Sequence, residues 1–377
     1  MKNYMIVGGN VAGVTAAVEL RKLDPEAQVT IFTKEAYPYY YRPKLWEIIA
    51  GEADPDEIYY HDQDWYAQQG IDLRLNTTVE GLKPDSKSIT LSSGETVQYD
   101  RLLIAAGSRS FVPPVKGTDL PKVFSLRDMD DTKAIVECAD SAKEAVVIGG
   151  GVLGLETAKA LTDRGLDVTV VEFFPILLPR QLDAEGAAIL THHLEGFGMR
   201  LLTDQVTETI EPTADGRLLV SLKSGQQLQT DMVVFSTGIR SNVSIWKEAG
   251  ATANRGLIVN EFMETSLPDV FAAGDVAEYD GIVYGIIPVA REQAKYAAAN
   301  MTNHHSSPYP GTLPSTRLKI AGLAFNALGE STLEGDGVTV LRVSEPEKGR
   351  YERLAIKDGK VAGAIVFGDN RRALAFK

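Results

Sequence analysis

The stretch EAVVIGGGVLGLETAKALTDRGLDVTVVEFF, residues 144–174, decides the fold of this chain. It runs from a short apolar segment through three glycines into an amphipathic segment and ends in a second apolar segment. A buried strand, a glycine turn, a helix and another buried strand make up the βαβ unit that opens each half of a doubly wound parallel sheet. The stretch therefore predicts an α/β fold.

A second stretch, YMIVGGNVAGVTAAVELRKLDPEAQVTIFTKE (residues 4–35), repeats this order of segments. Two such copies predict two nucleotide-binding domains. The final segment, residues 313–377, contains runs that alternate polar and apolar residues, as antiparallel strands do. The expected fold is thus two doubly wound, Rossmann-like domains followed by a small α+β domain.

The turn in residues 144–174 has the full dinucleotide spacing, and the next strand is followed by an acid. Backbone N–H groups of such a turn and the positive helix end favour a diphosphate. A carboxylate at Glu172 accepts hydrogen bonds from an adenosine ribose and repels a 2′-phosphate, which favours NADH over NADPH. The alternative is a tight turn without a ligand. The glycines concerned are Gly149, Gly151 and Gly154.

The first copy departs from this spacing, because Asn10 stands between Gly8 and Gly13 where a glycine is usual. A side chain there restricts the approach of the backbone to a diphosphate, although asparagine tolerates positive φ and can donate a hydrogen bond itself. The first acid, Glu35, comes late, after Thr33. We expect Glu35 to bind a ribose, with a solvated loop charge as the alternative.

Composition excludes several classes of protein. The net charge is −13, from 38 basic and 51 acidic residues, which argues against nucleic-acid binding. No apolar run is long enough for a membrane span and no signal peptide is recognisable, so we expect a cytoplasmic protein without membrane contact.

Cysteine and histidine usage narrows the chemistry further. The only cysteine, Cys138, cannot form an intrachain disulfide, and we expect it to be a packing residue. Adjacent histidines on a helix point in different directions, so the pairs His192–His193 and His304–His305 predict no metal site.

Four further motifs follow in order: LLIAAGSR (residues 102–109), FSTGIRSN (235–242), VFAAGDVAE (270–278) and PSTRLKIAG (314–322). With the two glycine turns, they make the chain resemble the FAD-dependent pyridine nucleotide-disulfide oxidoreductase superfamily. The resemblance gives the first turn to FAD and the second to NADH. It implies an FAD domain of residues 1–110 and 235–312, an NADH domain of residues 111–234 and a C-terminal interface domain of residues 313–377.

The resemblance also implies the residues that hold the cofactors. In the family, the acid of the second FAD motif, here Asp275, bonds the ribityl–phosphate region, and the residue at Val79 places its backbone against adenine. For FAD the residues are Gly8, Asn10, Ala12, Gly13, Thr33, Glu35, Arg42, Pro43, Val79, Ala105, Ala106, Gly107, Arg127, Gly274 and Asp275. For NADH they are Gly149, Gly151, Leu153, Gly154, Glu156, Glu172 and Gly238.

The segment PYYYRPKLWEIIAGE, residues 38–52, lies where disulfide reductases of this superfamily carry a redox cysteine, and it contains none. It is similar instead to the Arg/Lys-Pro segment of rubredoxin reductases, ferredoxin reductases and the flavin part of assimilatory nitrite reductase. Those enzymes pass electrons singly to an iron–sulfur or rubredoxin-type carrier. Glu47 stands where ferredoxin reductases commonly carry a lysine, which is a departure from that subtype.

Two residues are candidates for a catalytic role. The resemblance implies that Arg42 lies near the flavin or its diphosphate, where a cation stabilises reduced, anionic flavin; the alternative is a loop anchor. Glu156 matches a family glutamate near the nicotinamide and the flavin edge. It could polarise the carboxamide or pair with a cation from the loop around Arg42, or simply be a helix N-terminal acid stabilised by the dipole.

The expected function is that of an FAD-containing, NADH-dependent reductase that passes electrons through flavin to a small carrier such as rubredoxin or ferredoxin. The alternatives are an NADH oxidase that reacts with oxygen, a flavin module of a larger reductase, and an NADH-sensing flavoprotein. We expect a monomer or a homodimer. Candidates for docking an acidic carrier are Arg317, Lys319, Arg371, Arg372 and Lys377.

Overall fold

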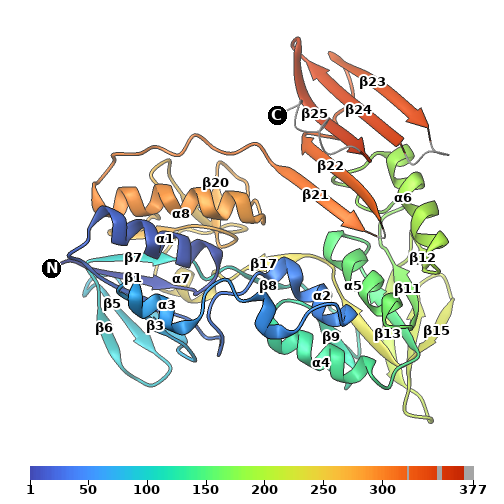
Figure 1. Cartoon of the computed structure of the whole chain (residues 1–377), viewed down its shortest axis with the longest axis horizontal. Helices are drawn as coiled ribbons and strands as arrows, with labels where there is room; N and C mark the ends of the chain where they lie inside the picture. The colour runs from blue at the N-terminus through green and yellow to red at the C-terminus, as the bar shows by residue number, and fades with distance from the viewer. Residues whose placement is uncertain (321, 346–349, 369–377) are drawn as a thin grey trace. The chain divides into compact units, whose positions relative to one another are not determined.

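The computed structural model describes residues 1–320, 322–345 and 350–368. The chain forms two compact units, each assembled from separate stretches of sequence. Parallel sheets flanked by helices occur in both units, which confirms the predicted α/β class (Figure 1). The first unit consists of Met1–Tyr41, Asp56–Arg109 and Ile239–Thr312; the second consists of Arg42–Pro55, Ser110–Gly238 and the chain from Leu313 onward.

A five-stranded parallel sheet is the centre of the first unit, with strand order β19-β7-β1-β2-β3. Its strands β1, β2, β7 and β19 are largely apolar and buried, as expected for strands covered on both faces, whereas the edge strand β3 also carries Asp72 and Arg74. The strands are β1 (Asn3–Val7), β2 (Gln28–Phe32), β3 (Ile71–Arg74), β7 (Arg101–Ile104) and β19 (Val270–Ala272).

Helices α1 (Val11–Leu23) and α8 (Ile287–Thr302) pack against each other in this unit. Both bury alanines, among them Ala16 and Ala17 on α1 and Ala297 on α8, and small side chains let two helices approach closely. Further elements of the unit are α3 (Gln63–Gln68), β4 (Val79–Lys83), β5 (Ser88–Leu91), β6 (Thr96–Gln98), β17 (Ile239–Ser241), α7 (Ser244–Glu248), β18 (Leu257–Val259) and β20 (Ala277–Tyr279).

The second unit repeats the design with the parallel sheet β12-β11-β10-β16-β9. Residues 144–174 supply two of its strands and the helix between them, as the sequence predicts. The strands are β9 (Val123–Ser125), β10 (Glu144–Ile148), β11 (Asp167–Val171), β12 (Arg200–Leu202) and β16 (Met232–Phe235). The helices are α4 (Met129–Ala139), α5 (Val152–Asp163) and α6 (Ala184–Gly196), and an antiparallel sheet is formed by β13 (Thr207–Pro212), β14 (Leu218–Leu222) and β15 (Gln227–Thr230).

The short helix α2 (Leu45–Ala50) belongs to the second unit, although it precedes the rest of that unit by many residues. It buries Leu45, Ile48 and Ile49 and packs against α5 and α4. Arg164, at the end of α5, donates a hydrogen bond of 2.8 Å to the carbonyl of Ile49. The segment that begins at Arg42 is therefore fixed to the helices that surround the second glycine turn.

The last part of the second unit is a five-stranded antiparallel sheet with strand order β21-β22-β25-β24-β23. No helix occurs among the described residues 313–320, 322–345 and 350–368, so this region shows the predicted strands alone. The strands are β21 (Ser315–Ile320), β22 (Leu323–Gly329), β23 (Val338–Glu345), β24 (Arg350–Lys357) and β25 (Lys360–Phe367).

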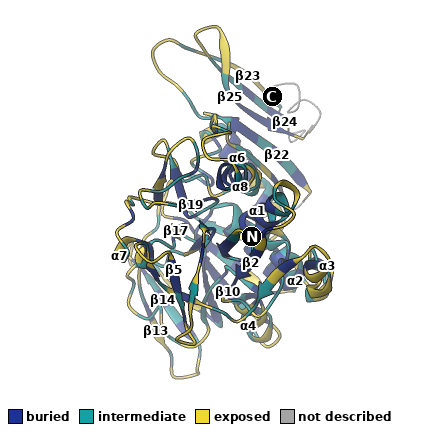
Figure 2. Cartoon of the chain, turned by 90° about the vertical axis from the view of Figure 1, so that its left-hand side faces the viewer, coloured by how far each residue is buried: buried dark blue, intermediate teal, exposed yellow. Residues whose placement is uncertain are grey.

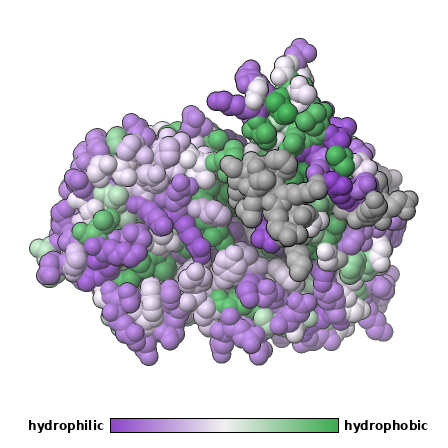
Figure 3. Space-filling model, turned by 45° about the horizontal axis from the view of Figure 1, so that its top comes forward, coloured by the Kyte–Doolittle hydropathy of each residue, from purple (hydrophilic) through white to green (hydrophobic). Residues whose placement is uncertain are grey.

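Burial follows the sheets. Strands of both parallel sheets are mostly dark blue in Figure 2, and exposed residues lie in loops, on outer helix faces and on the outer strand β23 of the C-terminal sheet. Hydrophilic atoms cover much of the face seen in Figure 3, in keeping with the acidic composition. Apolar exceptions include Leu341, Val343 and Val361 on the C-terminal sheet. Within the described residues, every helix is too short or too polar to cross a bilayer.

Candidate functional site

The second glycine turn connects β10 to α5, and its glycines are required for different reasons. A Cβ on Gly149 would lie 2.2 Å from the carbonyl oxygen of Ser236, and one on Gly154 would lie 2.0 Å from that of Gly149. A Cβ on Gly151 would meet nothing within 4 Å. Packing therefore excludes side chains at two positions, whereas the space beside Gly151 is left open.

The start of α5 suits an anion. Gly151 is its N-cap residue and supplies no side-chain hydrogen bond, so the first N–H groups of the helix remain available. Glu172 lies beside the turn, 7% exposed, and accepts hydrogen bonds from the N–H groups of Gly150 (2.5 Å) and Phe174 (2.7 Å). A carboxylate has about four acceptor positions, so its two oxygens can still accept from ribose hydroxyls.

The first glycine turn, between β1 and α1, has the same internal packing. A Cβ on Gly8 would lie 2.1 Å from the carbonyl oxygen of Ala105, and one on Gly13 would lie 1.9 Å from that of Gly8. Asn10 has φ −102° and caps α1, because its side chain accepts a hydrogen bond from the N–H of Val11. The positive φ that asparagine tolerates is therefore not used here.

The two copies differ at the position after the second strand. Val7 pairs with Phe32 in the first copy and Ile148 pairs with Val171 in the second, so Thr33 is equivalent to Glu172. Thr33 lies under Gly9 as Glu172 lies under Gly150. Glu35 follows two residues later and accepts a 2.6 Å hydrogen bond from the hydroxyl of Tyr40.

Segments far apart in the sequence meet at the first turn. Gly274 has φ +81°, and a Cβ on it would lie 3.1 Å from Cβ of Ala12. Asp275 accepts a 2.8 Å hydrogen bond from the hydroxyl of Ser108. The second FAD motif and the LLIAAGSR motif are thus held around the start of α1.

Three residues that the sequence analysis did not single out support this arrangement. Gln293 on α8 is 1% exposed and accepts a 2.9 Å hydrogen bond from the N–H of Gly274. Asn242 donates a 2.8 Å hydrogen bond to the carbonyl of Ala106. In the sequence, Ser108 directly follows Gly107, which the motif already singles out. Gln293 could be recognised only as a glutamine within an alanine-rich helix.

Arg42 and Arg127 lie together in the second unit, where the Arg42 guanidinium donates a hydrogen bond to the Arg127 carbonyl. Pro43 is the central residue of the short 3₁₀ turn Arg42–Lys44 that leads into α2. Lys44 forms an ion pair of 3.1 Å with Glu47. The other residues expected to bind FAD belong to the first unit. The roles of Arg42, Pro43 and Arg127 in binding FAD stay predictions.

Glu156 lies in the second turn of α5 and is half-buried. Burial raises the pKa of its carboxyl from 4.5 to about 7. Within the described part of the chain it has no hydrogen-bond or ion-pair partner, so the suggested pairing with a cation from the loop around Arg42 is not formed. Its carboxyl is therefore without a partner among the described residues, and it holds a proton more tightly than an exposed glutamate does.

The other predicted positions lie as follows. Val79 is a buried residue at the start of β4, Leu153 is half-buried on α5, and Gly238 has φ +107° in the loop after β16. Arg317 is exposed on β21. Lys319 lies on the same strand, and Arg371, Arg372 and Lys377 lie outside the described residues.

Cys138 is half-buried on α4. Burial raises the pKa of its thiol, which disfavours the thiolate that redox chemistry needs. The structure therefore gives this side chain no feature of a redox cysteine.

Comparison with known families gives two matches along the chain. The model described as pyridine nucleotide-disulphide oxidoreductase matches residues 2–299, which is well over half of the chain. The model described as rubredoxin NAD+ reductase C-terminal domain matches residues 314–377.

Individual proteins agree with these matches. The chain is 36% identical over 371 residues to a nitrite reductase (NAD(P)H) of Bacillus subtilis, covering 98% of this chain and 46% of that protein. It is 32% identical over 367 residues to the NADH-rubredoxin oxidoreductase of Clostridium acetobutylicum, covering 97% and 90%. The solved covalent complex of putidaredoxin reductase and putidaredoxin gives a TM-score of 0.90 at 25% identity, covering 98% and 91%. The chain spans about half the length of the Bacillus nitrite reductase that it matches.

Proposed function

The chain belongs to the pyridine nucleotide-disulphide oxidoreductase family, and from this we propose that it is an FAD-containing reductase that takes electrons from NADH and passes them to a small carrier protein such as rubredoxin or ferredoxin. The single observation that carries the proposal is the lack of a redox thiol, since the only cysteine, Cys138, is half-buried with a raised pKa. The match of residues 314–377 supports the carrier.

The first unit supplies most of the residues that we assign to FAD, all except Arg42, Pro43 and Arg127. Gly8 and Gly13 keep the turn free of side chains, and the N–H groups in the first turn of α1 that follow Val11 would hold the diphosphate. Ser108 orients Asp275 through its 2.8 Å hydrogen bond, and the carboxylate so oriented would accept hydrogen bonds from hydroxyls of the cofactor. When bound, FAD accepts a hydride from NADH and gives up electrons one at a time.

The second unit supplies the NADH site. The open space beside Gly151 admits the diphosphate close to the backbone, and the uncapped start of α5 offers N–H groups to it. Glu172 accepts hydrogen bonds from the ribose and repels a 2′-phosphate, which gives a preference for NADH. Glu172 is fixed for this task by the N–H groups of Gly150 and Phe174.

Arg42 and Glu156 act by charge and by position. The Arg42 guanidinium, anchored on the Arg127 carbonyl, provides positive charge that stabilises negative charge arising on reduction. Glu156 orients the nicotinamide carboxamide, accepting from its NH₂ group when ionised. Hydride transfer needs no further acid, base or nucleophile, so these residues contribute mainly by holding the reactants in place.

The acceptor is tested by an anaerobic screen that follows NADH consumption by the FAD-loaded protein. Rubredoxin and ferredoxin are added separately, and a parallel sample receives oxygen alone. The proposal expects carrier-dependent consumption that exceeds the rate with oxygen. Full turnover with oxygen and none with either carrier would identify an NADH oxidase instead, and slow turnover with every acceptor would favour an NADH-sensing flavoprotein.

A second candidate is a flavin module of a larger reductase, and one observation favours it. The match to the Bacillus nitrite reductase covers 98% of this chain but only 46% of that protein. The match to a second relative, an electron transfer subunit of assimilatory nitrate reductase, covers 48% of that protein. Isolation of the native protein from its source decides between the two. A polypeptide longer than 377 residues or a tightly bound catalytic subunit supports the module, and a free chain of this length supports the carrier reductase.

A further inference from the structure

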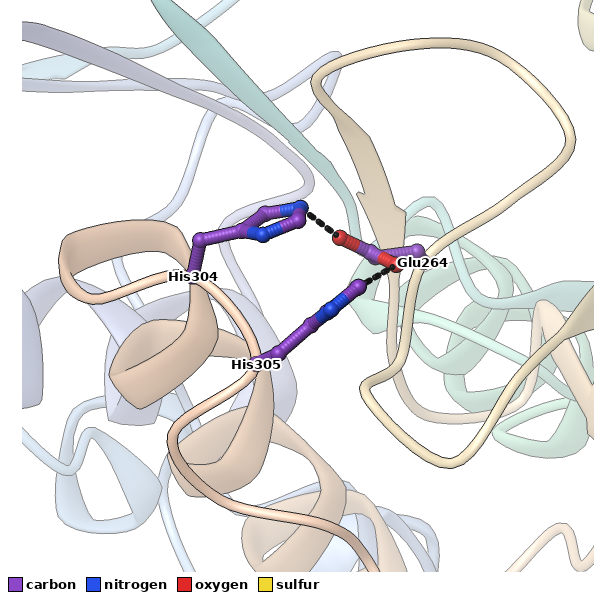
Figure 4. Close-up of side chains that lie close together, drawn as sticks. All are labelled: Glu264, His304 and His305. Carbon is purple, nitrogen blue, oxygen red and sulfur yellow. Dashed lines mark hydrogen bonds and ion pairs between the residues drawn. The ribbon is translucent and has the colours of Figure 1, made fainter.

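Glu264, His304 and His305 form a cluster in the first unit, outside the residues assigned to either nucleotide. His304 Nε2 lies 3.0 Å from one carboxylate oxygen of Glu264, and His305 Nε2 lies 3.0 Å from the other (Figure 4). One ligand atom from each of the three residues lies within 4.8 Å of the others. Both imidazoles thus point at the same carboxylate.

The local backbone brings the two histidines together. Helix α8 ends at Thr302, and His304 and His305 lie in the turn that follows, with φ +56° at His305. The adjacent rings stack with centroids 3.7 Å apart, whereas on a regular helix or strand they would diverge. The expected divergence of adjacent histidine rings is therefore wrong for His304 and His305, whereas His192 and His193 lie on the regular helix α6.

The carboxylate and one ring are held in place by a second set of contacts. Asn260 donates a 2.9 Å hydrogen bond to Oε2 of Glu264, and its own side-chain oxygen accepts from the N–H groups of Phe262 and Glu264. The Phe262 ring stacks on His305 at 4.1 Å. Contacts of this kind orient metal ligands before the ion binds.

Two imidazole nitrogens and a carboxylate oxygen are a ligand set for Zn²⁺ and similar ions, whereas Mg²⁺ and Ca²⁺ prefer oxygen ligands alone. With bonds of about 2.0–2.1 Å, a tetrahedral Zn²⁺ needs ligand atoms roughly 3.3 Å apart. The two 3.0 Å contacts go to different oxygens of Glu264, and the three ligand atoms lie within 4.8 Å of one another, so the side chains need to shift by up to about 1.5 Å to surround an ion. The rings of His304 and His305 are 59% and 46% exposed, so an ion can enter and keep water as its remaining ligand.

We propose that Glu264, His304 and His305 form a surface site for one divalent transition-metal ion of the Zn²⁺ class. Neutral imidazole binds a metal through one nitrogen and carries its proton on the other. Among the described residues, neither ring makes a second hydrogen bond, so each Nδ1 can hold that proton in contact with water. The ion replaces the direct contacts between the rings and Glu264.

The test is calorimetric titration of untagged, FAD-loaded protein with ZnCl₂, because an affinity tag rich in histidine would bind zinc itself. The wild-type chain is expected to bind one Zn²⁺. His304→Asn/His305→Asn is expected to weaken binding by about 10-fold or more, and Glu264→Gln is expected to weaken it as well. MgCl₂ at the same concentrations is expected to give no binding.

The matched control is His192→Asn/His193→Asn, which removes the same number of histidines from α6 and is expected to leave zinc binding unchanged. Circular dichroism and the FAD content of each variant show that it has folded. Equal zinc binding by the wild type and His304→Asn/His305→Asn, or an equal loss in the α6 variant, would overturn the proposal.

Discussion

Gly151 and Gly154 belong to one turn, yet only one of them is required by packing. Space for a side chain is open at Gly151, whose φ of −78° is available to any residue. At Gly154 a methyl group would collide with the carbonyl oxygen of Gly149. A glycine that folding does not require is the strongest sign in this structure of a ligand that must come close to the backbone.

Substitution of each glycine by alanine separates the two requirements. Gly151→Ala is expected to change the free energy of unfolding by less than about 0.5 kcal/mol and to weaken NADH binding on the order of tenfold. Gly154→Ala is expected to lower the free energy of unfolding several-fold more than Gly151→Ala does, because the backbone must move to accommodate the methyl group. Thermal unfolding and NADH titration measure the two effects. Unchanged NADH affinity in a stably folded Gly151→Ala variant would argue against the site.

Glu156 gives a pH-dependent prediction. Its pKa is about 7 in the folded protein and near 4.5 when exposed, so the folded state binds the proton more tightly. The resulting stability is fully present below about pH 4.5 and is lost as the pH rises through about 7. Glu156→Gln removes this loss. The variant is expected to be more stable than the wild type at pH 8, by up to about 3 kcal/mol, and similar to it at pH 4.

Urea unfolding at both pH values, without NADH, measures this difference. A stability gap between the variant and the wild type that is the same at pH 4 and pH 8 would show that Glu156 does not titrate as described.

Residue-level sequence reasoning found the glycines, because their spacing reflects backbone packing that repeats in both turns. It could not foresee that Thr33 takes the position of Glu172, since strand register decides which residue lies under the turn. The role of Gln293 could not be predicted from the sequence either, because its hydrogen-bond partner, the N–H of Gly274, comes from a distant segment.

At the scale of elements, local sequence predicts most helices and strands, and long-range packing decides where they belong. The βαβ units were readable because apolar strands and glycine turns have strong patterns. The membership of α2 in the second unit depends on its contacts with α4 and α5, which no local pattern contains. The same holds for the two histidines after α8, whose common direction depends on where that helix ends.

Asp183 connects two elements of the second unit and provides a test at this scale. It caps α6 by accepting a hydrogen bond from the N–H of Gly186, and its carboxylate lies 3.2 Å from Nε of the fully buried Arg353 on β24. Asp183→Ala removes one of the two carboxylates that contact that guanidinium, because Glu334 lies 3.1 Å from its Nη2. We expect a loss of about 2–3 kcal/mol, from the helix cap and from the buried contact together.

Asp62→Ala is the matched control, because Asp62 caps α3 through the N–H of Trp65 at an exposed position. It is expected to cost only about 1 kcal/mol. Thermal unfolding monitored by circular dichroism compares the two variants, and equal losses would show that the contact between α6 and the C-terminal sheet adds nothing beyond the cap.

The whole molecule consists of two compact units, each with a parallel sheet, and the second unit also contains the antiparallel C-terminal sheet. The family match and the resemblance read from sequence agree because the motifs occur in order over nearly the entire length. The electron acceptor was not readable, since it depends on a surface that matches a partner and not on a motif. The anaerobic acceptor screen is therefore the experiment that identifies the electron acceptor.

The most direct test of the central claim is anaerobic mixing of NADH with the FAD-loaded wild type and with Cys138→Ser. We expect the yellow flavin absorbance to bleach in both proteins at the same rate, with one NADH consumed per flavin, because no thiol takes part. Absence of bleaching in the wild type, or bleaching that is lost in Cys138→Ser although the variant retains its FAD, would contradict it.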